Sequence, residues 1–285
     1  MKLTIITPVY NRANLLGRLF GSLKAQTNHS FEWIIVNDGS TDDTETVAKE
    51  IARQDVRFAV RYYYRNNGGK HRAINMAVAK AKGEFCLIVD SDDYLDEKAV
   101  EVVLQWLGDI PDDYAGVAGV KAYENGDVIG GDGNGEGYID ATNLERKKYN
   151  LLGDKAEVYC TDLLRAYPFP EFDGEKFLSE GVVWNRIARD GYKVRWYSRV
   201  IYYAEYLEGG LTSHINEHHR RSPKGFAVYI KEMAGDEGFV KRVILYGLYA
   251  RDVYQYAHLS SAAADLGVPY WQVVLGCVIR RMIGK

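Results

Sequence analysis

Three aspartates stand close together at the end of a short apolar run. The run is Phe85–Val89, and the acids that follow it are Asp90, Asp92 and Asp93. Carboxylate oxygens are ligands that suit Mg²⁺ or Mn²⁺, and like charges held this close repel each other unless a cation offsets them. The same acids would also suit a turn that caps a helix beginning near Asp96. This acidic turn, residues 90–93, therefore leaves a metal site and a helix cap as alternatives.

Polar segments also follow three other apolar runs in the N-terminal part of the chain. They are Thr7–Arg12 after the first run, Asn37–Ser40 after the second and Asn66–Lys70 after the third. If the runs are parallel strands, these segments meet, because ligands of open α/β sheets bind outside the carboxyl ends of the strands. The four segments together predict one site, which is a stronger indication than any of them alone.

The elements that must position these residues alternate along the chain. Apolar runs predict strands at Leu3–Thr7, Glu32–Asn37, Phe58–Tyr64 and Phe85–Val89, and helical spacing predicts helices at Asn14–Ala25, Asp42–Arg53 and Lys70–Lys82. This alternation predicts an α/β fold with a mostly parallel sheet flanked by helices.

The rest of the chain is less regular. Strands are predicted at Tyr114–Tyr123 and Lys193–Tyr203, a helix at Glu180–Asp190, and a loop or hairpin in the glycine-rich segment Glu124–Gly137. The last 70 or so residues show helical patterns, with breaks near Gly235 and at Gly267–Pro269, and predict a helical C-terminal extension.

The composition is that of an ordinary soluble globular protein, with 47% apolar and 26% charged residues. A net charge of −3 gives no reason to expect nucleic acid as a partner. Three scattered cysteines do not suggest a disulfide framework and favour a reducing compartment. No apolar run reaches the length of about 18 residues expected of a transmembrane helix, and the N-terminus is predicted to be a strand rather than a signal peptide.

The segment Pro269–Lys285 is apolar around most of its circumference. Its small or polar positions Gln272, Gly276 and Arg280 recur every four residues. A helix of about 16 residues spans roughly 24 Å, which is short of a bilayer core of about 30 Å. An interfacial membrane helix and a helix docked on the core or on a second subunit are the two alternatives.

The polar segments together resemble those of glycosyltransferase family 2, the GT-A enzymes that use nucleotide-diphospho-sugars. Thr7–Arg12 is similar to the opening strand and loop of that family, Val36–Asp42 to its nucleobase-binding segment, and Asp90–Asp93 to its DxD motif. Asn67–Asn75 resembles the third element. The resemblance covers most of residues 1–215 and implies a GT-A fold.

A second part of the resemblance concerns the acceptor side. Glu180, followed by Arg186 and Gly191, looks like the catalytic-base helix of the family. The family often has Glu-Asp here, whereas this chain has Glu180 followed by Gly181. The resemblance implies that Glu180 is the general base, and the plainer alternative is a first-turn glutamate favoured by the helix dipole.

The resemblance also implies a nucleotide-sugar site made of Pro8, Tyr10, Arg12, Asp38, Lys70, Asp90 and Ser91. The ring of Tyr10 would stack on the base, and Asp38 would accept a hydrogen bond from the base, such as the imide N–H of uracil. Lys70 would contact the diphosphate or the base. The ordinary alternatives are strand-end packing for Tyr10, a turn for Asp38 and a solvated surface side chain for Lys70.

The implied metal ligands are Asp90, Asp92 and Asp93, with Asp92 the first choice, and the ion is Mn²⁺ or Mg²⁺. For Asp93, a second ligand and a helix-facing support are the two alternatives. His214 is a further candidate, because some GT-A enzymes recruit a C-terminal histidine to the metal. A surface histidine is the plainer alternative.

The resemblance implies an inverting, metal-dependent transferase. The expected donor is a UDP-sugar and the expected acceptor is a glycan or lipid-linked saccharide of surface polysaccharide assembly. Residues 1–110 would bind the nucleotide-sugar, 111–215 the acceptor, and 216–285 would form the helical extension, with peripheral membrane contact through 269–285. The expected location is the cytoplasm, at the inner face of the cell membrane. A non-catalytic sugar- or membrane-binding relative is the alternative from another class.

Overall fold

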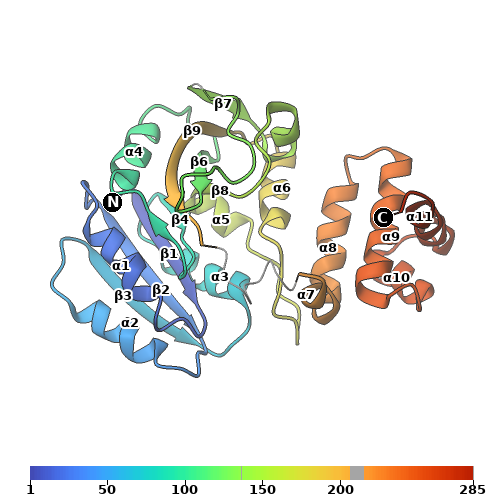
Figure 1. The fold of residues 1–285 in the computed structure, drawn as a ribbon, viewed down its shortest axis with the longest axis horizontal. Helices are drawn as coiled ribbons and strands as arrows, with labels where there is room; N and C mark the ends of the chain where they lie inside the picture. Colours follow the sequence, from blue (N-terminus) through green and yellow to red (C-terminus); the bar gives the residue numbers. More distant parts are fainter. Residues whose placement is uncertain (136, 206–214, 285) are drawn as a thin grey trace. The chain divides into compact units, whose positions relative to one another are not determined.

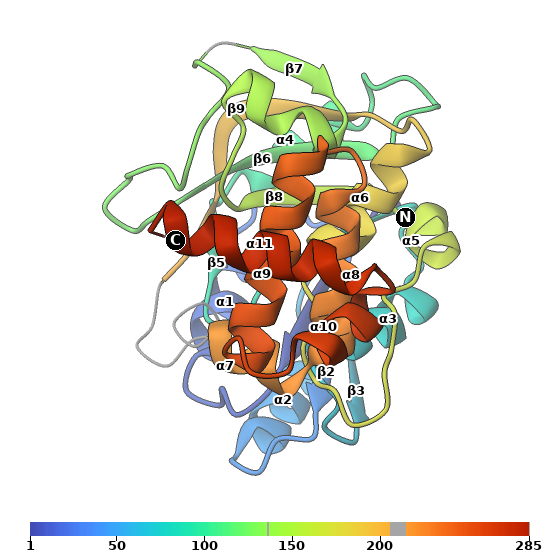
Figure 2. The same cartoon turned by 90° about the vertical axis from the view of Figure 1, so that its right-hand side faces the viewer.

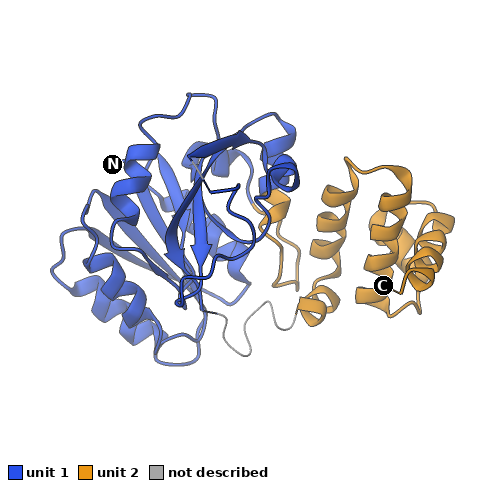
Figure 3. Cartoon of the chain, turned by 45° about the horizontal axis from the view of Figure 1, so that its top comes forward, with its two compact units in different colours: residues 1–168, 184–206 blue, residues 169–183, 207–285 orange. Residues whose placement is uncertain are grey.

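The computed structural model describes residues 1–135, 137–205 and 215–284 of the chain. Its residues fall into two compact units, which Figure 3 shows in different colours. Unit 1 comprises residues 1–168 and 184–206, and unit 2 comprises residues 169–183 and 207–285. The division of unit 1 into a donor half and an acceptor half stays a prediction, since one sheet runs through both.

Unit 1 is built on a nine-stranded sheet, in which the strand order is β3-β2-β1-β4-β8-β6-β9-β5 and β7 pairs with β9 (Figure 1). The strands are β1 (Leu3–Val9), β2 (Phe31–Asp38), β3 (Ala59–Arg65), β4 (Phe85–Ile88), β5 (Tyr94–Leu95), β6 (Gly116–Ala122), β7 (Tyr138–Ala141), β8 (Lys155–Cys160) and β9 (Val194–Tyr203).

The direction of the strands brings several of their ends to one edge. β1 to β4 are parallel, as predicted. β8 is antiparallel to both β4 and β6, so β6 runs in the same direction as β4, and β9 is parallel to β6. The carboxyl ends of β1, β2, β3, β4, β6 and β9 therefore share one edge of the sheet, which we call the carboxyl edge. The α/β class is confirmed, and the sheet is mixed beyond β4.

Helices cover both faces of this sheet. α1 (Leu16–Lys24), α2 (Thr44–Arg53) and α4 (Ala99–Trp106) contribute to one apolar core with the inward side chains of the strands, such as Leu3, Trp33 and Leu87. α3 (Lys70–Lys80) packs on β1 and β2 through side chains outside that core, including Ala73 and Ile74. The three helices predicted between the first four strands are thus present, each within a few residues of its predicted ends.

Several short elements carried no strong sequence pattern. They are β5, β7, β8, the 3₁₀ helix η1 (Asn143–Tyr149) and α5 (Thr161–Ala166). In the glycine-rich segment 124–137, Val128 forms an isolated antiparallel β-bridge with Ala122, the last residue of β6. That pairing agrees with the predicted loop or hairpin.

Unit 2 is helical beyond residue 215. Its helices are α7 (Ile215–Arg221), α8 (Pro223–Ala234), α9 (Phe239–Tyr254), α10 (Leu259–Leu266) and α11 (Tyr270–Met282). The breaks fall where Gly235 and Gly267–Pro269 predicted them. α6 (Gly181–Arg189) begins in unit 2 and continues into unit 1. The helical C-terminal extension is thereby confirmed.

α11 lies across α9 and α10 within unit 2 (Figure 2). The small or polar strip of α11 turns inward, since Gly276 and Arg280 are buried, and a Cβ at Gly276 would lie 1.8 Å from the carbonyl oxygen of Val243. Apolar side chains remain outside, with Trp271 55% and Met282 80% exposed.

Within the described ranges, no single helix is long and apolar enough to cross a membrane. Among the described helices, only α10 and α11 taken together meet that criterion by length and composition, and they are bent by 116° at their break.

Candidate active site

The loops after β1 and β2 are tied to each other at the carboxyl edge. Asn11, at a φ of 52°, donates its backbone N–H to Ser40 Oγ (2.9 Å) and accepts the Thr41 N–H at Oδ1 (2.8 Å). The neighbouring Tyr10 is 45% exposed. This ring is therefore available to a ligand from a loop that hydrogen bonds hold in place.

Asp38 joins the loop after β2 to the loop after β3. It is buried and pairs with Arg65. Its Oδ2 accepts the N–H of Gly69 at 2.7 Å and the Asn67 amide at 3.1 Å, and its Oδ1 accepts the N–H of Gly68 at 3.0 Å. Both oxygens are thus occupied by protein donors, and a contact with a nucleobase stays a prediction.

The acidic turn directs its acids toward different partners. Asp90 Oδ1 lies 2.6 Å from the ammonium of Lys70, and Asp92 Oδ2 lies 3.9 Å from Arg12 Nε. Lys70 begins α3 and Arg12 follows β1, so two separate loops bring cations to the turn. Of these two acids, Asp92 has the looser partner.

Asp93 points the other way, into unit 1. Its Oδ2 accepts the hydroxyl of Tyr202 (2.6 Å) and its Oδ1 accepts the N–H of Glu205 (3.0 Å). The Tyr202 oxygen also accepts the N–H of Asp90 at 3.0 Å. These hydrogen bonds fix the position of the acidic turn and occupy both carboxylate oxygens of Asp93.

Burial and the neighbouring charges shift the pKa values of the three acids of the turn in different directions. For Asp90, burial alone would raise the pKa, yet the charges of Lys70 and Lys121 outweigh it and hold the pKa below its ordinary value. Burial, aided by the negative charge of Asp90, raises the pKa of Asp92 and raises that of Asp93 to about 6. A cation at the turn would counter these upward shifts.

The acidic turn would supply only part of the ligands of a metal ion. Among the described residues, no three His, Cys, Asp or Glu side chains converge on one point. Mg²⁺ in nucleotide sites is commonly bound by one or two carboxylates and completes its shell with phosphate and water oxygens. Asp92, with Asp90 beside it, suits such a site, whereas the geometry of Asp93 is that of a support.

The remaining predicted residues are placed as follows. Pro8 is buried near the end of β1, opposite Val36 of β2, and Ser91 is buried within the acidic turn. Glu180 lies in unit 2 and accepts the N–H of Val183 at its carbonyl, directly before α6. His214 lies outside the described residues, so its predicted role has no structural counterpart here.

Some residues at this edge were not singled out from the sequence. Tyr202 supports Asp93, and Lys121 lies over the ring of Tyr202 at 4.1 Å. Arg18 of α1 donates to the carbonyl of Asp92 and pairs with Glu205 at 2.6 Å. The sequence signal that could have pointed to Lys121 is that it is a lone lysine in an otherwise apolar strand.

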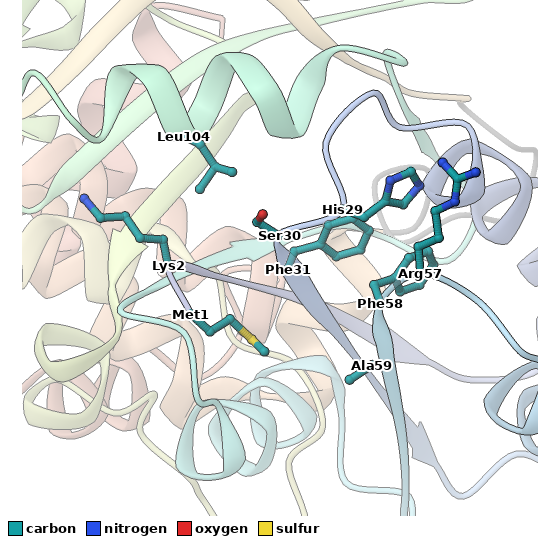
Figure 4. Close-up of a pocket in the computed structure, with 9 residues that line it drawn as sticks. All are labelled: Met1, Lys2, His29, Ser30, Phe31, Arg57, Phe58, Ala59 and Leu104. Atoms are coloured by element: carbon teal, nitrogen blue, oxygen red, sulfur yellow. The ribbon is translucent and has the colours of Figure 1, made fainter.

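A separate hollow of about 560 Å³ opens at the opposite edge, near the amino ends of β1, β2 and β3 (Figure 4). Its described lining residues are Met1, Lys2, His29, Ser30, Phe31, Arg57, Phe58, Ala59 and Leu104, and they include no carboxylate. It lies at the opposite ends of the strands from the four polar loops, and its described lining supplies no carboxylate for a metal ion. We therefore place the candidate active site at the carboxyl edge.

Comparison with known proteins identifies the family. The glycosyl transferase family 2 model matches residues 4–167, and the chain belongs to this family. Glycosyltransferase GlyG of Streptococcus pneumoniae is 36% identical over 103 residues, which are 36% of this chain and 34% of GlyG. TarS of Staphylococcus aureus, named a poly(ribitol-phosphate) β-N-acetylglucosaminyltransferase, is 35% identical over 103 residues, or 35% of this chain and 18% of TarS. The matches thus span about a third or less of these curated relatives.

Solved structures share the fold. TarS 1–349 in complex with UDP-GlcNAc superimposes with a TM-score of 0.65 at 20% identity and covers 99% of this chain and 92% of that one. The mannosyltransferase PcManGT of Pyrobaculum calidifontis, in complex with GDP-Man and Mn²⁺, gives a TM-score of 0.60 at 18% identity, covering 98% and 80%. The predicted GT-A fold is confirmed by these likenesses.

Proposed function

We propose that this chain is an inverting, metal-dependent glycosyltransferase that moves a sugar from a nucleotide-diphospho-sugar to a hydroxyl group. The observation that carries the proposal is the carboxyl edge of unit 1. There the loop of Tyr10, the Lys70–Asp90 pair and the carboxylate of Asp92 come together in a family 2 chain. An aromatic face suits a nucleobase, an ammonium suits a diphosphate, and carboxylates suit a metal cation.

The proposed reaction is a single displacement. The acceptor oxygen forms a bond to the anomeric carbon while the bond from that carbon to the diphosphate oxygen breaks, and the electron pair leaves with the diphosphate. Glu180 accepts the hydroxyl proton as general base. Because attack and departure occur on opposite sides, an α-linked donor gives a β-linked product.

Asp92 is the proposed direct ligand of the metal, with Asp90 beside it. When Mn²⁺ or Mg²⁺ is bound, its charge offsets the negative charge that the leaving diphosphate gains. Lys70 pairs with Asp90 at 2.6 Å. Lys70 would turn from this carboxylate toward the diphosphate when the donor arrives, while Asp93 and Tyr202 keep the turn in place.

The proposed donor is a UDP-sugar, and the proposed acceptor is a glycan or lipid-linked saccharide of a surface polysaccharide. The structure of TarS with UDP-GlcNAc and the name of that relative support this choice. The structure of PcManGT with GDP-Man and Mn²⁺ supports the metal and keeps GDP-sugars as a second donor class.

We also propose that α11 contacts a membrane surface at the cytoplasmic face. Its outer stripe carries Trp271, Val278 and Met282, spaced as one side of a helix, and each of them is about half exposed or more. The basic Arg281 is also exposed at this end of the helix. An apolar stripe with nearby positive charge is typical of an interfacial helix.

Hydrolysis of a panel of UDP-, GDP- and other nucleotide-sugars, with and without Mn²⁺, tests the transferase proposal. We expect one donor class to be hydrolysed slowly in Mn²⁺, because water can replace the acceptor. If none is hydrolysed while glycan or lipid still binds, the chain is the non-catalytic binding relative instead.

A further inference from the structure

Lys121 occupies an unusual place in unit 1. It is the last but one residue of β6, whose carboxyl end lies at the same edge as those of β1 to β4. The residues around it in β6 are apolar or small and buried, whereas Lys121 itself is half-buried. A lysine that ends a core strand at the ligand-binding edge is well placed to meet a ligand.

The ammonium of Lys121 sits beside the acidic turn without pairing with it. It lies 4.1 Å from the centroid of the Tyr202 ring, and the hydroxyl of that tyrosine bonds to Asp93 and to the backbone of Asp90. Within the described part of the chain, Lys121 has no carboxylate within 4.0 Å. In contrast, the ammonium of Lys70 contacts Asp90 at 2.6 Å.

With respect to the described residues, this position leaves hydrogen-bond donors of the Lys121 ammonium unused. An ammonium has three N–H donors, and the face of a ring attracts the charge without accepting them all. The ring of Tyr202 therefore orients Lys121, while its N–H groups stay available for an anion at the carboxyl edge.

The order of strands indicates which part of a donor would lie nearest. Along the sheet, the loops after β3, β2 and β1 come first, the acidic turn after β4 comes next, and β6 lies further on, beyond β8. A donor with its base at the first loops and its diphosphate at the acidic turn would extend toward β6 with its sugar end. Lys121 thus lies on the sugar side of the turn.

We propose that Lys121 binds the sugar-bearing phosphate of the donor and stabilises it as the leaving group. This inference rests on the proposed function, and it adds a cation that the predicted site did not include. Charge accumulates on that phosphate as the sugar departs, so a fixed ammonium there stabilises the transition state more than the ground state.

The test compares nucleoside diphosphates with monophosphates. Binding of UDP, GDP and ADP, and of UMP, GMP and AMP, is measured by calorimetry in Mn²⁺ for the wild-type chain and for Lys121→Met. For the diphosphate that the wild type prefers, we expect affinity to fall roughly 10- to 100-fold, the range of a lost charge-assisted hydrogen bond, and affinity for its monophosphate to fall less than about twofold. Turnover should fall as well, and Lys121→Arg should restore part of both.

Lys147→Met serves as the matched control, because Lys147 is an exposed lysine of η1 in the same unit. It should leave both affinities unchanged. Equal losses for diphosphate and monophosphate, or a change confined to the acceptor KM, would overturn the inference. If the wild type binds none of these nucleotides, the proposed function fails together with it, whereas binding that Lys121→Met leaves intact removes only the role of Lys121.

Discussion

The three carboxylates of the acidic turn differ in the protein groups with which they already interact. Asp93 uses both oxygens on Tyr202 and Glu205, and Asp90 pairs with Lys70 at 2.6 Å. Among the described residues, the ion pair of Asp92 is with the guanidinium of Arg12, at 3.9 Å. An incoming cation would meet less competition at Asp92 than at Asp90, because Arg12 lies farther from Asp92 than Lys70 lies from Asp90.

Glu180 belongs to the other half of the proposed chemistry, and its replacement separates base catalysis from binding. Glu180→Gln keeps the size of the side chain but removes its ability to accept a proton. We expect transfer to fall by roughly 10²- to 10⁴-fold, the usual range for a lost general base. Metal-dependent binding of the nucleoside diphosphate should stay at the wild-type level in calorimetry.

Glu237→Gln is a suitable control for this change, since Glu237 is a surface glutamate of the same unit that pairs with Lys241. It should leave transfer unchanged. Substantial transfer by Glu180→Gln would move the base to another residue.

At the scale of residues, the sequence predicted which loops lie at the carboxyl edge but not which side-chain atoms contact each other there. Each of Tyr10, Asp38, Lys70 and Asp92 was predicted from its place after an apolar run, and all lie at the carboxyl edge. The hydrogen bond between Tyr202 and Asp93 was not predictable, because Tyr202 is far along the chain from the acidic turn. The saturation of Asp38 likewise depends on how the loop of Gly68 and Gly69 folds.

Among the elements, α9 and α11 show how one position limits packing. A Cβ at Gly276 would lie 1.8 Å from the carbonyl oxygen of Val243, so the two helices would have to separate. We expect Gly276→Ala to lower the free energy of unfolding by about 2 to 3 kcal/mol, as overpacking of a tight contact does. Urea denaturation followed by circular dichroism measures the change.

Gly21 is the matched glycine for this prediction. It lies inside α1, and a Cβ there meets no atom within 4 Å. Gly21→Ala should raise the free energy of unfolding by about 0.5 to 1 kcal/mol, because alanine loses less backbone entropy in a helix. An unchanged stability for Gly276→Ala, or a loss for Gly21→Ala, would contradict this account of the packing.

Elements with strong periodicity were predictable, and short ones were not. The first four strands and the helices between them have buried runs or apolar stripes, and their ends were predicted to within a few residues. β5 has two residues and β7 has four, and both are strands because β9 pairs with them. No local pattern of two to four residues specifies such pairing.

For the whole molecule, the exposed stripe of α11 leads to a prediction about membranes. Replacing Trp271, Val278 and Met282 together by serine removes apolar area from the outside of α11 and leaves its buried face intact. Binding to vesicles of phosphatidylcholine and phosphatidylglycerol should weaken at least ~10-fold, since each buried side chain of this kind contributes about 1.5 to 3 kcal/mol. Cosedimentation measures the bound fraction.

The control for this variant lies in unit 1. Val128, Tyr138 and Leu152 are exposed apolar residues there, and their replacement by serine should leave vesicle binding unchanged. If the α11 variant sediments with vesicles as the wild type does, the membrane proposal fails. A loss of self-association instead would show that this stripe binds a second copy.

The sequence motifs indicated a single site more clearly than they indicated the organisation of the whole chain. The division into units, with residues 169–183 grouped with the C-terminal helices, follows from packing between segments that are distant in sequence. Contacts of this kind produce no periodic pattern in the sequence. The four polar loops, in contrast, are consecutive and local, and the sequence predicted their convergence.

The most direct test of the central claim is the metal dependence of donor hydrolysis in the wild type and in Asp92→Ala. Initial rates are measured with UDP- and GDP-sugars in Mn²⁺, in Mg²⁺ and with EDTA. We predict that the wild type hydrolyses one donor only when a divalent ion is present, and that Asp92→Ala loses at least ~100-fold of that rate while its thermal unfolding stays unchanged. Hydrolysis that persists in EDTA, or that Asp92→Ala retains in full, would contradict the assignment of the acidic turn as the metal site.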